Sequence, residues 1–195
     1  MTISKVAICN MALGELGAKE ISSLTDGSTA AALCSRHYDQ TVDEVLAMAD
    51  WKCAMARKQL AASSETPDFE YDYQYPLPTN PYCLRVRAMC LDDGSELEAD
   101  WTREGDMLLT NQDECYIKYI KRVTDPMKFE PLLVTAIYLQ LAIKFAPKLQ
   151  KDTADKGRLI EEFEKLVLPR AKYATAKEGY GPDQVKSTER WTHRS

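Results

Sequence analysis

Residues 50–61, with the sequence DWKCAMARKQLA, decide how the rest of this chain is organised. They follow a segment with helical periodicity and begin with Asp50 and Trp51. We predict that the helical pattern continues weakly to Ala62 after a bend near Asp50. Trp51 stands at the junction, and we predict that it is a core residue joining this helical segment to an extended β-module further along the chain.

Two helices are predicted on the N-terminal side of this stretch. The first runs from Lys5 to Leu16, with Ser4 as its N-cap and Gly17 as its stop. Its apolar face includes Leu13, a predicted core residue. The second helix begins near Ser28. Its apolar residues recur at three- and four-residue steps and predict a buried stripe of Ala31, Cys34, Tyr38, Val42, Val45 and Ala49.

The segment on the C-terminal side changes character. Prolines and tyrosines between residues 63 and 82, including YQYPLP at 73–78, forbid a helix and favour extended backbone. From Cys83 to Arg122 apolar residues alternate with the others, beginning with CLRV at 83–86. Asp92-Asp93-Gly94 is a turn signal. We therefore predict a small antiparallel sheet of three or four strands.

Two further helices are predicted after the sheet. Pro131 suits the first turn of a long helix that ends near Phe145 and is apolar on nearly all sides. The last helix is predicted from about Thr153 to Lys177, with a kink at Pro169. Its inward side chains are predicted to be Leu159, Phe163, Leu166 and Tyr173. No regular structure is predicted beyond Gly179.

Together these patterns predict an α+β protein that is mainly α: a helical bundle with an inserted small antiparallel β-module and an extended C-terminal tail. The N-terminal helices of the bundle occupy 1–62 and the β-module 63–125. The C-terminal helices follow at 126–178 and the tail at 179–195. A chain of 195 residues and 22.1 kDa fits one domain, or one domain carrying an insertion.

The charge balance restricts the partners of the chain. A net charge of −5 argues against a general nucleic-acid binder, which shows a basic surface. It suits a channel wall past which DNA slides, because an acidic wall does not grip phosphates. Residues from Arg170 onward carry six Lys or Arg and three Asp or Glu, a net of +3, so the rest of the chain carries −8. Such a basic end is typical of a docking element or of a solvated terminus.

No membrane or secretory signal is found. The N-terminal residues lack a basic segment leading into an apolar run, so no signal peptide is predicted. No apolar run approaches the roughly 20 residues that span a bilayer, and no membrane association is expected. Six cysteines without such a signal are typical of reduced thiols in a cytosol.

The chain shows no catalytic, cofactor-binding or metal-binding constellation. His37 lies beside the apolar stripe of the second helix without a Cys or acidic partner at ligand spacing, and His193 is in the tail. The cysteines form no C-x-x-C pair. No Gly-x-Ser-x-Gly signature or phosphate-binding glycine loop is present. We therefore predict that the protein is not an enzyme and binds no cofactor or metal.

Two alternative functions stay open at this point. Glu15, Glu20 and Asp26 near the first loop could supply the two carboxylates of a tail-associated cell-wall (peptidoglycan) hydrolase. With thirty acidic residues in the chain, however, such pairs are common by chance. The other alternative is a DNA-binding regulator, which the acidic body disfavours.

Taken in order, several segments of this chain resemble the head–tail adaptor proteins of short-tailed phages, the tail tubular protein A family. The segments are ICNMAL at 8–13, Trp51 with Ala54 and Arg57, YPLP at 75–78, CLRV at 83–86, and residues 119–125. The match covers nearly the whole chain, and the polar end with Trp191 and Arg194 also looks like the family. One departure is Lys52-Cys53, where relatives often carry an asparagine and an aromatic residue.

The resemblance implies a virion structural protein that forms a homo-oligomeric ring, a dodecamer, at the head–tail junction. One side of such a ring binds the portal protein and the other receives the tail nozzle, a tail tubular protein B-like protein, with tail fibres as further neighbours. Genomic DNA would pass through the lumen during ejection without specific binding. The resemblance places assembly in the host bacterial cytoplasm and implies no enzymatic activity.

The tail is expected to dock on the portal. Trp191 has no local core to join, so an intermolecular pocket is its predicted position. The predicted docking residues are Tyr180, Lys186, Arg190, Trp191 and Arg194.

Overall fold

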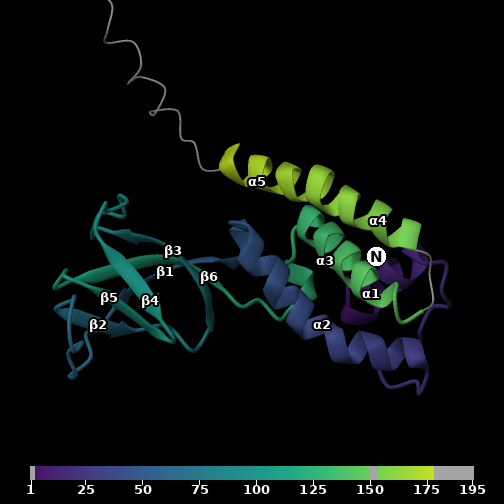
Figure 1. Cartoon of the computed structure of the whole chain (residues 1–195), viewed down its shortest axis with the longest axis horizontal. Coiled ribbons are helices and arrows are strands. Elements are labelled where there is room, and N and C mark those ends of the chain that lie inside the picture. Colours follow the sequence, from purple (N-terminus) through teal and green to yellow (C-terminus); the bar gives the residue numbers. More distant parts are fainter. Residues whose placement is uncertain (1–2, 150–152, 178–195) are drawn as a thin grey trace, which may run out of the picture.

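The computed structural model describes residues 3–149 and 153–177 (Figure 1). Helices gather at one end of the molecule and strands at the other. The chain passes from the helices to the strands between residues 48 and 55 and returns after residue 121. The region that follows the long second helix joins the two ends; it contains residues 50–54, the start of the stretch quoted above.

Helix α1 spans Lys5–Glu15 and has the predicted cap and stop. The Ser4 hydroxyl accepts a hydrogen bond from the Ala7 amide at 3.1 Å, which satisfies one of the free amides of the first turn. Gly17 adopts a positive φ of 57°, and the next amide, of Ala18, bonds the Leu13 carbonyl at 2.9 Å. The helix thus begins and ends through local interactions that its sequence announces.

Helix α2 spans Thr29–Met48, with Ser28 as its N-cap. At its other end Ala49 is extended, with φ −145° and ψ 168°, so the helix does not continue. The Trp51 indole Nε1 donates to the Val45 carbonyl, in the last turn of the helix, at 2.9 Å. Trp51 is fully buried and lies in the helical core, so the same residue ends the helix and anchors the chain that leaves it.

The predicted continuation of the helix to Ala62 is wrong. A short 3-10 turn, η1 (Lys52–Ala54), follows Trp51, and then β1 (Met55–Leu60) begins. Its residues MARKQL all favour helices by intrinsic propensity. They form a strand because β6 (Cys115–Lys121) pairs with every one of them, from Met55 opposite Ile120 to Leu60 opposite Cys115. Tertiary pairing therefore outweighs local propensity here.

The strands form two antiparallel sheets of three strands each within the described residues, rather than the one small sheet that was expected. The first sheet has the order β1-β6-β3 and the second the order β2-β5-β4. The bounds of the remaining strands are β2 (Tyr73–Pro76), β3 (Cys83–Cys90), β4 (Trp101–Glu104) and β5 (Met107–Thr110). The sheets share one core, which includes Tyr75, Val86, Leu108 and Ile117.

The predicted strict alternation along β3 is also incorrect. The pairing of β3 with β6 shifts register between Cys83 and Arg85 and again between Val86 and Ala88. Each shift places an extra residue in β3 and resets which side chains point inward. Cys83, Val86 and Met89 are consequently buried although they are not spaced by even numbers of residues.

The predicted fold class, a mainly α helical bundle with a small insertion, is therefore wrong. The protein is α+β, 43% helical and 22% strand, and the described residues form two small antiparallel sheets. The error has two physical sources. The segment 55–60 pairs as a strand. The two sheets also enclose a hydrophobic core of their own, so they form more than a small insertion in a helical bundle.

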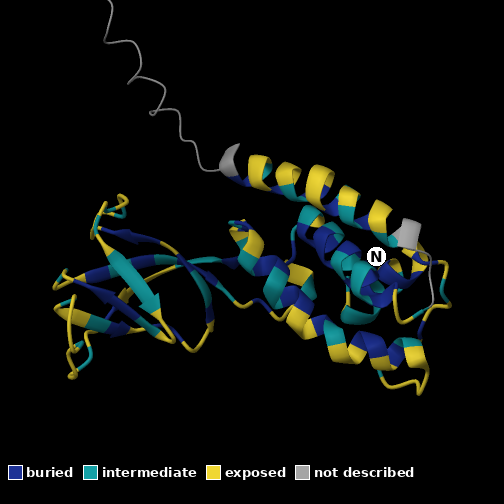
Figure 2. Ribbon diagram, viewed as in Figure 1, coloured by how far each residue is buried: buried dark blue, intermediate teal, exposed yellow. Residues whose placement is uncertain are grey.

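The described residues form two hydrophobic cores, and β6 contributes to both (Figure 2). Ile120 belongs to the helical core, whereas Ile117 and Tyr119 belong to the core between the sheets. Leu13, Tyr38 and Trp51 are all buried in the helical core.

Helix α3 (Pro131–Phe145) begins at proline as predicted and is buried along most of its length. The last helical segment consists of α4 (Thr153–Glu162), a π-helical turn η3 (Phe163–Val167) and α5 (Leu168–Lys177). The π turn lies just before Pro169, where the ring cannot fit a regular α-helical turn. Together these elements make four helical rods in the described part of the chain.

The inward face of the last helix differs from the prediction. Leu159 and Phe163 are buried as expected, but Leu166 and Tyr173 are 49% and 63% exposed. Val167 and Ala171 take the inward positions. The wider π turn keeps residues at a constant four-residue step on one face, whereas the prediction assumed a regular α-helix.

Replacing Trp51 with alanine is expected to destabilise the whole protein. The change removes a fully buried side chain and leaves the Val45 carbonyl without its indole donor. We expect the free energy of unfolding to fall by about 3–5 kcal/mol, measured by urea denaturation. Trp101→Ala is the matched control: this tryptophan is only half-buried at the start of β4, so its loss should cost clearly less. Equal losses for the two variants would contradict the anchoring role of Trp51.

Candidate functional site

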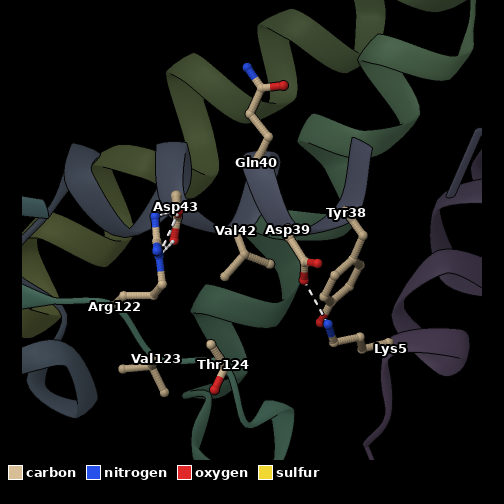
Figure 3. Close-up of a pocket in the computed structure, with 9 residues that line it drawn as sticks. All are labelled: Lys5, Tyr38, Asp39, Gln40, Val42, Asp43, Arg122, Val123 and Thr124. Atoms are coloured by element: carbon tan, nitrogen blue, oxygen red, sulfur yellow. Dashed lines mark hydrogen bonds and ion pairs between the residues drawn. The ribbon is translucent and has the colours of Figure 1, made fainter. Parts of the chain in front are cut away.

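A cleft of about 340 Å³ lies beside α2, where α1 and the chain after β6 approach it (Figure 3). Lys5 donates to the Asp39 carboxylate at 2.6 Å, and its ammonium lies 5.2 Å from the centre of the Tyr38 ring. Arg122 donates through Nε to both carboxylate oxygens of Asp43, each at 2.9 Å. Every charged side chain lining this cleft thus has a partner of opposite charge.

The ion pair of Arg122, in this cleft, connects the helical end of the molecule to the strands. Arg122 follows directly after β6, and its partner Asp43 is on α2. The hydrogen bond to Asp43 raises the pKa of Arg122 above its ordinary value. The guanidinium also lies 4.8 Å from the centre of the Tyr82 ring, a cation–π contact. With its charges satisfied internally, the cleft serves the fold and is not a strong candidate for ligand binding.

A second, larger hollow lies between the first sheet and the last helix. We call it the basic groove; its volume is about 1030 Å³. The end of α2, the η1 turn, strands β1, β3 and β6, and α5 all contribute to its walls. Its lining includes six cations, Lys52, Arg57, Arg85, Arg87, Lys118 and Lys172, and two carboxylates, Asp50 and Glu96. A concave surface of net positive charge therefore exists on a chain whose total charge is −5.

Asp50 organises one wall of the basic groove. Its Oδ1 accepts from Arg85 Nη2, and its Oδ2 accepts from Arg87 Nε at 2.7 Å. Glu96 lies further out, 3.8 Å from Arg87 Nη1 and 3.7 Å from Lys118 Nζ. Asp50 comes directly before Trp51, so these arginines tie the end of the helical region to β3.

Opposing effects act on the pKa of Asp50. Burial is the largest single effect and raises it, but the hydrogen bonds from Arg87 and Arg85 and their charges together lower it below the ordinary value of 3.8. The same contact raises the pKa of Arg87. The carboxylate is therefore held ionised by its two arginines.

Three cations of the basic groove have no such partner. Lys52, Arg57 and Lys172 are exposed and form no ion pair with any described residue. They come from three different elements, the η1 turn, β1 and α5. Their convergence leaves uncompensated positive charge in a hollow, which is the arrangement that attracts an anionic partner.

Apolar side chains form part of the same surface. Met48, at the end of α2, is 37% exposed, and Met55, at the start of β1, is half-buried. The backbone between them is held in place, because the Cys53 amide donates to Glu130 Oε1 at 2.8 Å, beside the start of α3. The basic groove therefore combines charge with an exposed methionine surface on a fixed backbone.

The structure describes all three predicted core residues but none of the predicted docking residues. Leu13 and Trp51 are fully buried and Tyr38 nearly so, and burial raises the pKa of the Tyr38 phenol. The docking residues Tyr180, Lys186, Arg190, Trp191 and Arg194 lie outside the described residues.

The carboxylates proposed for a hydrolase have structural partners. Glu15 lies 3.5 Å from Arg158 Nη2. Asp26 accepts from the Ser28 hydroxyl at 2.6 Å and from the amides of Ser28 and Ser22, and these bonds lower its pKa. A general acid of a glycosidase needs a raised pKa, which is the opposite shift. Glu20 is exposed in the loop between the helices.

One histidine and six cysteines lie within the described residues. His37 packs beside Phe145 with ring centres 6.2 Å apart, and burial is the main cause of its lowered pKa. All six cysteines are free thiols; burial raises the pKa of Cys115 to about 12 and that of Cys53 to about 11. Across residues 3–149 and 153–177, no three His, Cys, Asp or Glu side chains are grouped to hold a metal ion. His193 lies outside the described residues.

Sequence reasoning missed the basic groove. Its residues are scattered from Met48 to Thr175 and meet only through sheet pairing and the return of the last helix. One local signal was present: Arg85 and Arg87 alternate in CLRVRAMC, which is typical of one charged strand face. That signal did not reveal that Asp50 and Lys172 lie across from the same face.

Two sequence comparisons found no relative of this chain. No protein-family model matches the chain, and no curated protein matches its sequence. Within the described residues, no helix is both long and apolar enough to cross a membrane.

Asp50→Asn is expected to destabilise the protein at neutral pH, because it removes the charge that two arginines share. We expect a loss of about 1–3 kcal/mol by urea unfolding. Asp39→Asn is the control, since that carboxylate is 78% exposed and its pair with Lys5 should contribute only about 0–1 kcal/mol.

The pH dependence has a definite sign. The folded-state pKa of Asp50 lies below its ordinary value of 3.8, so its stabilisation is fully present above that value and is lost as pH falls through the folded-state pKa. The stability difference between wild type and Asp50→Asn should therefore be larger at about pH 7 than at about pH 3. A difference that stays constant over this range would show that the ionised carboxylate is not the cause.

Proposed function

We propose that the chain is a virion structural protein, a head-to-tail adaptor that forms a ring between a phage portal and the tail nozzle. The observation that carries the proposal is the ordered set of segments that resemble the tail tubular protein A family, from ICNMAL at 8–13 to residues 119–125. The correct fold class for the proposal is α+β with two sheets.

The positions of these segments support the proposal. Ile8, Cys9 and Leu13 are in the helical core, as are Trp51 and Ala54. Tyr75, Leu77, Cys83 and Val86 are in the core between the sheets. Most apolar residues of the resembling segments therefore belong to one of the two cores.

The ion pairs between the helices and the strands also support a structural role. Arg122 with Asp43, and Asp50 with two arginines, tie the helices to the strands from two sides. A ring subunit at a head–tail junction must keep its shape while DNA passes. The net charge of −5 suits a lumen through which DNA moves without being held.

On this proposal the partners are other copies of the chain in a dodecamer, the portal, the nozzle and neighbouring tail fibres. The site of action is the virion head–tail junction, after assembly in the host bacterial cytoplasm. The role requires no catalytic residue, cofactor or metal.

The isolated subunit is expected to be monomeric or loosely associated, and to form a ring on the portal. A heterologous interface closes a ring only at the right angle between copies, and a template sets that angle. Sedimentation velocity should show a small species for the protein alone and a large complex after mixing with the portal of its own phage. Tight dodecamers at low concentration without portal would contradict the template; no complex with portal at any ratio would contradict the function.

Deleting residues 179–195 is expected to abolish portal binding and to leave the melting temperature nearly unchanged. The segment carries few large apolar side chains, so it adds little to a core, while its basic residues and Trp191 suit docking. Trp191→Ala should cause most of the same loss, and Trp191→Phe should retain part of the binding. Full-strength co-sedimentation of the truncated protein with portal would show that docking belongs to another surface.

A further inference from the structure

We propose that the basic groove is one half of the contact between neighbouring copies, and that the other half is the acidic loop of the next copy. The acidic loop is residues 63–72, between β1 and β2. The inference deepens the proposed function, because it names the surfaces that join subunits in the ring.

The acidic loop carries charge opposite to that of the groove. Glu65, Asp68, Glu70 and Asp72 are all exposed, and none forms an ion pair with a described residue. No lysine or arginine occurs between Ala61 and Leu84. The loop therefore carries unpaired negative charge, and the groove carries unpaired positive charge.

The loop also carries an apolar side chain that suits the groove. Phe69 is 78% exposed at the centre of the acidic residues. The groove offers Met48 and Met55, and thioether sulfurs make favourable contacts with aromatic rings. A phenylalanine flanked by carboxylates thus matches a methionine surface flanked by cations.

The loop has a defined conformation rather than a free path. The Asp72 amide donates to Asn111 Oδ1 at 2.9 Å, and Gln74 Nε2 donates to the Glu65 carbonyl at 3.1 Å. Glu70 adopts a positive φ of 73°. Both ends of the loop are therefore fixed to the second sheet, so docking would require less ordering than for an unstructured peptide.

The loop and the groove of one copy lie apart. The groove includes Lys52, Met55 and Arg57 at the start of β1, whereas the loop begins beyond the other end of that strand. In Figure 1 the loop lies beside β2, at the end of the molecule away from the helices. Two different surfaces that fit each other make a head-to-tail contact, which closes a ring at the right angle.

A nucleic acid is the less suitable occupant. Phosphates make no use of the exposed methionine surface, whereas an aromatic side chain does. The chain as a whole is acidic, and nucleic-acid binders normally show a continuous basic face.

The test uses two variants of the full chain without portal. The groove-reversed variant is Arg57→Glu with Lys172→Glu, and the loop-neutral variant is Asp68→Asn, Phe69→Ala and Glu70→Gln. The control is Lys58→Glu with Lys128→Glu, which makes the same change in charge at exposed positions outside the groove. Melting temperatures identify any variant that fails to fold; Arg57→Ala alone then replaces a groove variant that does so, and Phe69→Ala alone a loop variant.

Wild type and control should associate weakly at high concentration and low salt, and raised salt should dissociate them. Each variant alone should be monomeric. Mixing the two should give a one-to-one dimer and nothing larger, because only one intact groove and one intact loop remain to pair. Carbodiimide should cross-link Lys52 or Lys172 to a loop carboxylate between isotopically labelled and unlabelled copies.

Several results would overturn the inference. They are no association or cross-link in wild type, assemblies larger than a dimer in the mixture, or no dimer there. Duplex DNA binding that only the groove-reversed variant loses would assign the groove to nucleic acid instead. Normal rings of the groove-reversed variant on portal would refute this interface and leave the proposed function standing. A mixed dimer, together with a wild-type protein that never binds portal, would support this interface and refute the proposed function.

Discussion

The hydrogen bond from the Trp51 indole to the Val45 carbonyl is the contact on which the rest of this structure depends. It ties the chain that leaves α2 to the last turn of that helix, and it satisfies the buried indole N–H. Because the ring is then fixed in the helical core, Asp50 on one side and the η1 turn on the other take defined positions. The direction of β1, the arginine contacts of Asp50 and one wall of the basic groove all follow.

The parts of the fold that sequence predicted well are those determined by neighbouring residues. The caps at Ser4 and Ser28 and the proline start of α3 depend on interactions within a few positions, and the structure contains each of them. The segment 55–60 failed for the opposite reason. Its residues favour a helix, and only β6, which is distant in sequence, makes it a strand. The inward face of the last helix failed because a π turn changed its period.

The candidate site was less accessible to sequence than the fold. The absence of a recognisable catalytic motif could be read directly, but a surface formed by the end of a helix, three strands and a distant helix could not. Asp50 shows why. In the sequence it is one carboxylate among thirty acidic residues. Its importance comes from Arg85 and Arg87, whose positions depend on the register shifts within β3.

The double membership of β6 has a consequence for how this protein opens. Ile120 is sealed by the helices, while Ile117 and Tyr119 are sealed by the sheets. If one core opens, the other core still holds part of the strand in place. The amides of β6 should therefore exchange with solvent only through openings that involve both ends of the molecule, and the two regions should unfold as a single cooperative unit. A strand shared by two cores is therefore expected to couple the unfolding of one to that of the other.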